Sequence, residues 1–355
     1  MEALLTIQCG IVALTKRKQQ FLDLEYERLQ HFLQTKEDRG LYSANKQQAQ
    51  RFCKVVKPCR EYPLSIRNDL LKIRRVGNSV SEFWVKIPNK NARQLWVAVK
   101  PHRPFPETFK VCESKLYRRH GKFYLNIAVK TEVKENLFFR RILAVDLGER
   151  TIATTVLLCN GVVSHPRFYG RKVRGLRRHY AWLRKRLGEK KALDTIRKIK
   201  DTERRKVNAV LHKVSRDIVD EAERENAIVV LGDLTGIRQR AQRKGRRMRR
   251  IVGNMPFYRL TKMITYKATL KGILVVTTSE AYTSRNCHVC GCEGDRKTQG
   301  LFVCSHCGEY SADLNGAINI GLKFERNLGY MPLFGAVREP ARTPTALRLE
   351  KPPYL

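Results

Sequence analysis

Hydrophobic positions in the first part of the chain follow two different periods. From Leu14 to about Ile73 they recur at helical spacing, in segments such as FLDLEYERLQHFL, and Pro58 and Pro63 interrupt the pattern. Between about Asn78 and Val133 apolar and polar residues alternate, which is typical of half-buried strands. We therefore expect a small antiparallel β-domain that carries a helical insertion at about 14–75.

Two shorter segments complete this predicted β-domain. The apolar run Leu4–Ile11 has the length of a strand and is expected to pair with the strands of 78–133. Arg119–Lys122 places His-Gly between two alternating runs, which predicts a hairpin turn. No basic residue precedes the first apolar run, so we expect no signal peptide, and no transmembrane segment is evident.

After about residue 140 the apolar runs become continuous, which predicts buried strands that alternate with helices. Ile142–Leu158 reads as a strand, a turn at Gly148 and a returning strand, with Gly161–Ser164 as a third strand. The segment Ala227–Arg238 begins with a strand that ends at Gly232-Asp233, and Ile273–Thr278 reads as another strand. The segments 166–226, Phe257–Leu270 and 311–323 are expected to be helical. The pattern predicts an α/β domain.

Three acidic residues, Asp146, Asp233 and Asp313, stand at comparable points of this domain. Asp146 interrupts an apolar strand, which is costly unless the carboxylate has a partner such as a metal ion, although a purely structural role is equally common. Asp233 ends a later strand, and Glu280 closes the strand before the cysteines. Asp313 begins the last helix, where an N-cap role is the alternative. The order of a strand that carries an acid, a glycine turn and a second strand suggests an RNase H-like fold. Carboxylates brought together in such a fold could hold two Mg²⁺ ions for phosphodiester hydrolysis.

The strongest single motif is a pair of CxxC sequences separated by thirteen residues. Cys287, Cys290, Cys304 and Cys307 supply the four thiolates of a structural zinc site. Cys292 lacks the two-residue spacing and is left out of the predicted ligand set. The alternative is four buried or disulfide-bonded cysteines, but nothing marks the chain as secreted, and ten cysteines fit a reducing compartment.

Charge indicates the class of partner. The 355 residues include 71 Lys and Arg against 33 Asp and Glu, a formal net charge of +38. Such an excess predicts a polyanion partner, most commonly nucleic acid, with an anionic membrane surface as the alternative. The basic runs 167–206 and 238–250 are the predicted contact regions, the second as a mobile loop. The predicted phosphate contacts are Arg171, Lys172, Arg174, Arg177, Arg178, Arg184, Lys185, Arg238, Arg240, Arg243, Lys244, Arg246 and Arg247.

Several motifs in 142–321 resemble one protein family. They are AVDLG around Asp146, GDLTGIR around Asp233, FYRLTKMITYKATLKGI, and the zinc segment YTSRNCHVCG, FVCSHCG and ADLNGAINIG. They resemble the TnpB (OrfB-type) proteins of insertion sequences, which are RNA-guided DNA nucleases related to the type V CRISPR effectors. The N-terminal part is similar to that family only in its layout.

The resemblance implies a domain order. A β-barrel wedge domain with a helical recognition insertion would occupy 1–140, and an RNase H-like (RuvC-type) nuclease domain with a basic helical insertion at about 166–226 would occupy 141–281. A zinc ribbon at 282–310, the last nuclease-domain helix at 311–323 and a poorly ordered tail at 324–355 would follow.

The resemblance also implies an activity. The chain would bind a guide RNA encoded by the element and cut double-stranded target DNA in the prokaryotic cytoplasm, on the nucleoid, without a membrane partner. Asp146, Asp233 and Asp313 would be catalytic and hold Mg²⁺, with Glu280 as a possible accessory residue, while Zn²⁺ would be structural. Base pairing would supply sequence choice, so that protein contacts need only read the backbone.

One position departs from the family pattern. The family has Glu followed by Asp or Asn at the second catalytic strand, whereas Gly232 takes the Glu place here and Asp233 follows. A shift by one residue normally turns a strand side chain to the other face. Three outcomes stay open: Asp233 replaces the Glu, Glu280 helps, or cleavage is impaired and the protein acts by occupancy of DNA. A strand-transferring transposase is a further alternative.

Overall fold

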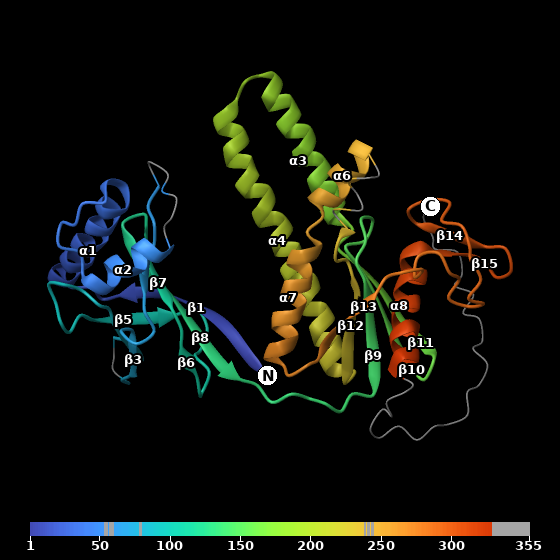
Figure 1. The fold of residues 1–355 in the computed structure, drawn as a ribbon, viewed down its shortest axis with the longest axis horizontal. Coiled ribbons are helices and arrows are strands. Elements are labelled where there is room, and N and C mark those ends of the chain that lie inside the picture. The colour runs from blue at the N-terminus through green and yellow to red at the C-terminus, as the bar shows by residue number, and fades with distance from the viewer. Residues whose placement is uncertain are drawn as a thin grey trace. The chain divides into compact units, whose positions relative to one another are not determined.

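The structure, a computed structural model, describes residues 1–52, 56, 60–77, 80–237, 239, 242 and 245–328 (Figure 1). The chain divides into two compact units, Met1–Val133 and a second that begins at Lys134. Four of the predicted phosphate contacts and the tail beyond residue 328 lie outside the described residues; the four are Arg238, Arg240, Arg243 and Lys244.

An eight-stranded sheet organises the first unit. Its order is β2-β7-β8-β1-β5-β4-β3, with β6 paired to β8, and every pairing is antiparallel. The strands are β1 (Glu2–Val12), β2 (Leu64–Ile66), β3 (Lys72–Arg75), β4 (Phe83–Lys86), β5 (Trp96–Pro101), β6 (Lys110–Val111), β7 (Ser114–Arg119) and β8 (Lys122–Glu132). The predicted strand Leu4–Ile11 is therefore confirmed, since β1 pairs with both β8 and β5.

The hairpin predicted at residues 119–122 joins β7 to β8. Arg119 pairs with Lys122, and the two residues between them have positive φ angles, 50° at His120 and 72° at Gly121. Two left-handed residues give the turn whose twist matches the strands of a two-residue hairpin. The sequence located this turn correctly.

The helical insertion is shorter than the sequence predicted. It contains α1 (Lys16–Thr35), which Thr15 caps through its side chain, and α2 (Ser43–Phe52). The prediction of helix up to Ile73 is wrong at its end, because Leu64–Ile66 and Lys72–Arg75 form β2 and β3. β2 is stabilised by pairing with β7, a partner distant in sequence, and β3 by pairing with β4, the next strand along the chain.

A five-stranded mixed sheet organises the second unit, in the order β11-β10-β9-β12-β13. The strands β9 (Arg141–Asp146), β10 (Ala153–Cys159) and β11 (Val162–Tyr169) form an antiparallel meander. β12 (Ala227–Asp233) runs parallel to β9, and β13 (Val275–Ser279) runs parallel to β12. The carboxyl ends of β9, β12 and β13 therefore meet at one edge of the sheet.

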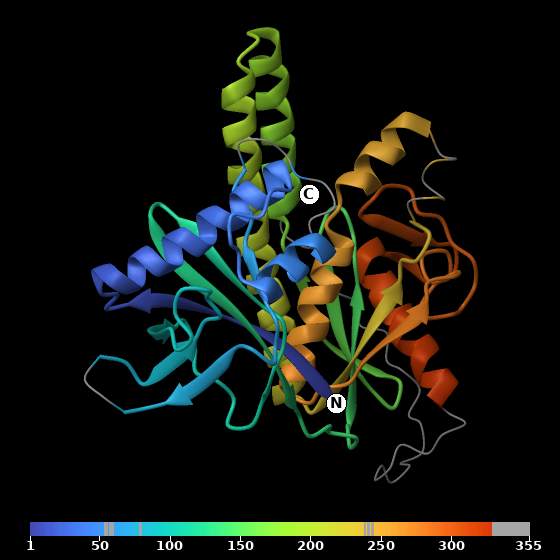
Figure 2. The same ribbon diagram turned by 60° about the vertical axis from the view of Figure 1, so that its left-hand side comes forward.

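Helices cover both faces of this sheet (Figures 1 and 2). On one face α8 (Ala312–Leu328) packs against Ala144 of β9 and Val230 of β12. On the other face α4 (Leu193–Arg224) and α7 (Phe257–Leu270) pack against Val145 and Leu231. Because successive side chains of a strand alternate between its two faces, residues two positions apart enter the same helical layer.

Three boundaries in the second unit differ from the predictions. Strand β11 extends to Tyr169, where a helix was expected from residue 166, because β11 pairs with β10 along its length. Residues 245–250, expected in a mobile loop, belong to α6 (Gly245–Asn254), whose arginines are compatible with a helix. α8 continues to Leu328, five residues beyond the expected end at 323, and Phe324 packs in its core.

The remaining elements are two extensions of the second unit. α3 (Lys172–Glu189) and α4 form a long antiparallel helical pair that projects from the sheet (Figure 1). β14 (Leu301–Cys304) and β15 (Gly308–Ser311) form a small hairpin inserted before α8. Among the helices that the structure describes, none has the length and apolar character that spanning a membrane requires.

Candidate active site and metal centre

Asp146 and Asp313 approach each other although 167 residues separate them in the sequence. Asp146 is the last residue of β9 and shares the face of Ile142 and Ala144, which pack against α8. Asp313 lies in the first turn of α8. A Cβ atom added to Gly316 would lie 3.0 Å from Oδ2 of Asp146, so the glycine lets the helix approach the end of the strand closely.

Two side chains hold the Asp313 carboxylate in place. Asp313 is only 3% exposed, and its Oδ2 accepts a hydrogen bond of 2.7 Å from the buried hydroxyl of Thr151. Its Oδ1 lies 3.3 Å from a guanidinium nitrogen of Arg296, which comes from the cysteine-containing insertion. Sequence analysis singled out neither Thr151 nor Arg296. The position of Thr151, five residues after Asp146, gave no separate signal.

The electrostatics of Asp146 reflect this arrangement. Although the residue keeps some exposed surface, burial and, after it, the negative charge of Asp313 raise the pKa of its carboxyl from 3.8 to about 7. The positive charge of Arg296 acts in the opposite direction. Two neighbouring carboxylates with too little compensating charge fit a site for a divalent cation bound through oxygen.

The acids do not form a closed cage by themselves. In the described part of the chain, the groups of three or more ligating side chains whose ligand atoms all lie within 4.8 Å of one another consist of cysteines and one histidine. Among the residues that the structure describes, Asp146 and Asp313 are thus a pair of carboxylates and not part of a closed set of three or more ligands.

The structure does not bring Asp233 to this pair. Asp233 is exposed at the end of β12, and its Oδ1 accepts a hydrogen bond of 2.8 Å from the backbone N–H of Thr235. Because side chains alternate along β12, Asp233 lies on the same face as Val229 and Leu231, which pack on the α4 and α7 side. Gly232 instead lies on the face that is covered by α8, where Asp146 and Asp313 lie.

Glu280 occupies the space above Gly232. It directly follows β13, and by the same alternation it belongs to the face of Val276, which packs on the α8 side. A Cβ atom added to Gly232 would lie 2.7 Å from Cγ and 2.8 Å from Cδ of Glu280, and closer still to Oε1. The sequence signal for this residue was its position at the end of a strand, but its approach to Gly232 depends on strand register.

The four predicted zinc ligands converge as the sequence indicated. The Sγ atoms of Cys287, Cys290, Cys304 and Cys307 all lie within 4.8 Å of one another and could hold a metal ion. Cys290 and Cys304 approach to 3.5 Å. A second group is formed by Cys290, Cys292 and His306, all exposed, so Cys292 lies closer to the centre than its spacing suggested.

The thiols influence one another's protonation. The backbone N–H of Cys292 is the largest influence that lowers the pKa of Cys290, to about 6. The pKa of Cys307 is raised to about 12, chiefly by its hydrogen bond with Cys290. A site in which one thiolate is stabilised while its neighbour holds a proton suits a cation that displaces the remaining protons.

The cysteine-containing insertion before α8 is called the cysteine module below. Two asparagines on α8 attach it to the helix that carries Asp313. Asn315 Oδ1 accepts a hydrogen bond of 2.9 Å from the backbone N–H of His288, and its Nδ2 donates to the carbonyl of Asn286. Asn319 Nδ2 donates to the carbonyls of Thr283 and Asn286, at 2.9 and 2.7 Å. The spacing of these asparagines was visible in the sequence, but their partners were not.

The predicted basic contacts on α3 differ in their surroundings. Arg174 and Arg184 form ion pairs with Glu149 and Glu203. Arg177 is half-buried, and burial lowers the pKa of its guanidinium. Four others are exposed and lie along or next to α3, namely Arg171, Lys172, Arg178 and Lys185. Arg246 is exposed on α6, and the side chain of Arg247 lies outside the described part.

The aromatic residues of this region also divide into two groups. Tyr180 is 5% exposed and packs between the helices, and Tyr169 donates a hydrogen bond of 3.0 Å to Glu221. Trp182 is 57% exposed and stacks against His179 at 6.3 Å between ring centroids. Phe168 is 37% exposed beside Arg171. Trp182 and Phe168 are thus available for stacking on bases.

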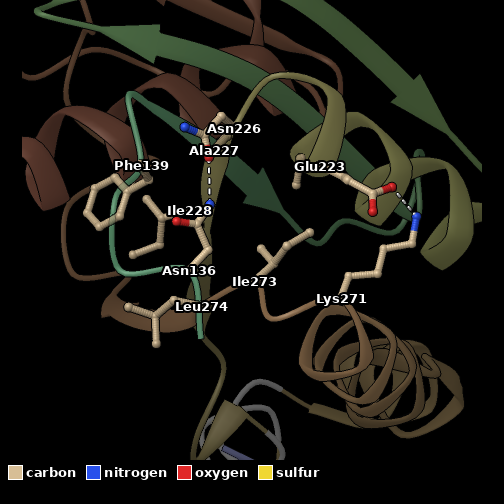
Figure 3. A pocket seen from close by; sticks show the side chains of 10 residues that line it. Asn136, Phe139, Glu223, Asn226, Ala227, Ile228, Lys271, Ile273 and Leu274 are labelled. Atoms are coloured by element: carbon tan, nitrogen blue, oxygen red, sulfur yellow. Dashed lines mark hydrogen bonds and ion pairs between the residues drawn. The ribbon is translucent and has the colours of Figure 1, made fainter. Parts of the chain in front are cut away.

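One pocket of about 70 Å³ lies away from the acids (Figure 3). Its lining includes Asn226, Ala227 and Ile228 at the start of β12, and Lys271, whose ammonium pairs with Glu223. Asp146, Gly232 and Glu280 stand instead at the carboxyl ends of their strands. The pocket therefore belongs to the opposite end of the sheet and contributes nothing to the acid site.

Sequence comparisons relate this chain to known proteins. Residues 257–320 match the family model described as Cas12f1-like, TNB domain. A TnpB-like protein of Methanocaldococcus jannaschii is 27% identical over 213 residues, which are 58% of this chain and 74% of that protein. The resemblance to TnpB-type proteins is confirmed.

The resemblance extends to the Cas12f proteins, which are type V CRISPR effectors. The CRISPR-associated endodeoxyribonuclease Cas12f2 of a Micrarchaeota archaeon is 30% identical over 222 residues, 58% of this chain and 41% of that protein. A cryo-EM structure of a Cas12f1–sgRNA–target DNA complex matches with a TM-score of 0.42 at 12% identity and covers 90% of this chain and 99% of that chain. The chain thus spans less than half the length of Cas12f2.

Proposed function

We propose that this chain is an RNA-guided DNA endonuclease associated with a transposable element, which hydrolyses phosphodiester bonds at a Mg²⁺ site. The observation that carries the proposal is the convergence of Asp146 and Asp313: burial, and after it the charge of Asp313, raises the pKa of Asp146 to about 7. The relatedness to a TnpB-like protein and to endodeoxyribonucleases supports the choice of DNA as substrate. The binding of a guide RNA encoded by the element is proposed from the same relatedness.

The fold proposed for this activity is RNase H-like, with a wedge domain before it and a zinc ribbon within it. Three antiparallel strands followed by two parallel ones, with Asp146 at the end of central β9, support the nuclease fold. The antiparallel sheet with its helical insertion supports a wedge and recognition role for the first unit. The proposed site of action is the prokaryotic cytoplasm, on the nucleoid.

Asp146 and Asp313 would hold the catalytic metal through their carboxylate oxygens. Mg²⁺ bound there would neutralise charge on a phosphate and help to activate water. Thr151 fixes the orientation of Asp313 through its hydrogen bond. Arg296 provides positive charge beside the same carboxylate, and its exposed side chain can also meet a phosphate oxygen.

The second metal proposed is Zn²⁺, held by Cys287, Cys290, Cys304 and Cys307. Four thiolates close a structural tetrahedral site and leave no position for catalysis. Its role here is to fold the insertion that presents Arg296 and that Asn315 and Asn319 attach to α8. Zinc would therefore support the acid site indirectly.

The exposed basic residues beside and along α3 are proposed to contact the phosphates of the guide RNA and the target. The four exposed residues named above, together with Trp182, form a surface suited to backbone contacts and base stacking. The predicted contacts at 238–244 remain a proposal on the sequence alone.

A second function is favoured by one observation, the glycine at position 232. Where the family has a catalytic Glu, this chain has no side chain at all. A protein that lacks an essential acid would bind a guide RNA and DNA without cutting and would act by occupancy.

The decisive experiment purifies the protein with its bound RNA, sequences that RNA, and supplies a matching plasmid with Mg²⁺. We expect cleavage by the wild type, none by Asp146→Asn, and wild-type cleavage by the matched surface variant Asp194→Asn. The absence of bound RNA would overturn the guide proposal. Bound RNA with no cleavage by the wild type would establish the occupancy function instead.

A further inference from the structure

We propose that Glu280 is the third carboxylate of the acid site and that it takes the place left open by Gly232. The inference rests on the proposed nuclease function and deepens it. It also excludes Asp233 from the site. Three independent features of the structure carry it: strand register, the space above Gly232, and the surroundings of Asp233.

Strand register places Gly232 beside Asp146. In the parallel pairing of β12 with β9, Leu231 pairs with Val145, so the next residues in register are Gly232 and Asp146. Neighbouring strands lie about 4.8 Å apart. A side chain above Gly232 on the α8 face would therefore be next to the Asp146 carboxylate.

The side chain above Gly232 is that of Glu280. In the pairing of β12 with β13, Gly232 is opposite Thr278, and Glu280 is two residues further on the same face. Its Cγ and Cδ lie so near the missing Cβ of residue 232 that any larger residue there would have to displace Glu280. Glycine at 232 is thus the condition for Glu280 to reach this place.

Asp233 has a different environment. It is exposed, it accepts the N–H of Thr235, and strand alternation turns it to the α4 and α7 face. Moving it to the α8 face would require a register shift of β12, which would also turn Val229 and Leu231 away from the α4 and α7 layer in which they pack. A carboxylate arriving from the neighbouring strand needs no such change.

The chemical consequence is that the site keeps three carboxylates. Asp146, Asp313 and Glu280 would approach a divalent cation from a strand end, a helix start and the adjacent strand end, and would draw closer together to bind it, since their ligand atoms do not all lie within 4.8 Å of one another. The ligand charge is the same as when residue 232 itself is Glu, and only the direction from which the third carboxylate approaches differs.

The first test measures metal binding by the purified full chain without nucleic acid. Mn²⁺, a redox-stable and calorimetrically convenient substitute for Mg²⁺, is titrated into zinc-loaded wild type and variants. We expect Glu280→Gln and Asp146→Asn each to weaken Mn²⁺ binding at least about tenfold. Asp233→Asn and the exposed control Glu309→Gln should bind like the wild type.

The second test moves the carboxylate back. Gly232→Glu alone should lower the melting temperature because the new side chain collides with Glu280. The double variant Gly232→Glu/Glu280→Gly should fold and bind Mn²⁺ within a few-fold of the wild type, and it should restore the cleavage lost in Glu280→Gln. This pair keeps the proposal testable even if Glu280→Gln were poorly folded.

The outcomes separate this inference from the proposed function. Wild-type Mn²⁺ binding and cleavage by Glu280→Gln, together with losses in Asp146→Asn, would overturn the role of Glu280 alone. A loss in Asp233→Asn equal to that in Asp146→Asn would assign the third carboxylate to Asp233. Unchanged Mn²⁺ binding by Asp146→Asn would overturn the metal site itself.

Discussion

Single residues decide whether this chain can hold a catalytic cation. Asp146 and Asp313 are brought together by the close approach of α8 to β9, for which Gly316 leaves room. Gly232, which in sequence looks like the loss of an acid, in the structure is the position over which Glu280 lies. The same close approach affects the protonation of Asp146, because burial and the charge of Asp313 raise the pKa of its carboxyl to about 7.

Replacing Asp146 by Asn should stabilise the metal-free protein in a pH-dependent manner. A raised pKa means that the folded state keeps a proton that the unfolded chain releases, so wild-type stability falls as pH rises from about 4 to about 7. We expect Asp146→Asn to gain roughly 1–4 kcal/mol over the wild type at pH 8 and nothing near pH 4.

This prediction is checked by urea unfolding of zinc-loaded protein in buffers without Mg²⁺. Asp194→Asn, on an exposed part of α4, serves as the control. A stability difference between Asp146→Asn and wild type that does not vary with pH would contradict the raised pKa.

At the scale of elements, α8 connects the two predicted metal sites. Its first turn carries Asp313, and Asn315 and Asn319 hold the loop that contains Cys287. The next face of the helix packs into the sheet through Ala317 and Ile318. Displacement of the cysteine module would therefore also displace the start of α8.

The double variant Asn315→Ala/Asn319→Ala should loosen the cysteine module. The carbonyls of Thr283 and Asn286 would lose their side-chain donors, at a cost of about 1–3 kcal/mol in unfolding free energy. We expect faster zinc release to a chelating dye and weaker Mn²⁺ binding. Asn327→Ala, exposed on the same helix, should leave both unchanged.

Zinc content should discriminate between the two cysteine groups. If Cys287, Cys290, Cys304 and Cys307 are the ligands, Cys307→Ser should lose bound zinc, whereas Cys292→Ser should keep one zinc per chain. Metal analysis by mass spectrometry after gel filtration measures this directly. Retained zinc in Cys307→Ser with loss in Cys292→Ser would assign the site to the alternative group.

For the whole molecule, the dominant physical property is its charge of +38. A surplus this large is tolerated most easily when phosphates neutralise it, and the α3–α4 pair extends part of it away from the sheet (Figure 1). Some of these charges are already compensated inside the chain, as in the pair of Arg184 with Glu203. The uncompensated, exposed ones should dominate binding.

The variant Arg178→Gln/Lys185→Gln should weaken binding to nucleic acid and reduce its salt dependence. Each lost phosphate contact lowers the slope of log K against log salt by roughly 0.7–0.9. The matched variant Arg197→Gln/Arg204→Gln removes arginines of α4 that already pair with Asp194 and Asp201, and it should change the slope less. Fluorescence anisotropy with a short DNA duplex at several salt concentrations measures both. Equal slopes in the two variants would argue against α3 as a contact surface.

Much of the fold follows from local patterns. The hairpin at His120-Gly121, the helix Phe257–Leu270 and the strand that carries Asp146 were all located from periodicity and turn residues. The boundaries that failed depend on strand pairing. β2 pairs with β7, a strand distant in sequence, whereas β3 and the end of β11 pair with the neighbouring strands β4 and β10, and the periodicity of one segment does not report any of these pairings.

The sequence by itself determined the basic character, the four clustered cysteines and the two acids Asp146 and Asp313, because these signals lie in composition, short spacing or a polar residue within an apolar run. Only the tertiary structure decided the surroundings of these residues. That Glu280 lies over Gly232 while Asp233 turns away depends on the register between β12 and β13 and on the alternation of side chains along both. Register is set by the packing of entire strands between helices, so the residues at positions 232 and 280 do not reveal it on their own.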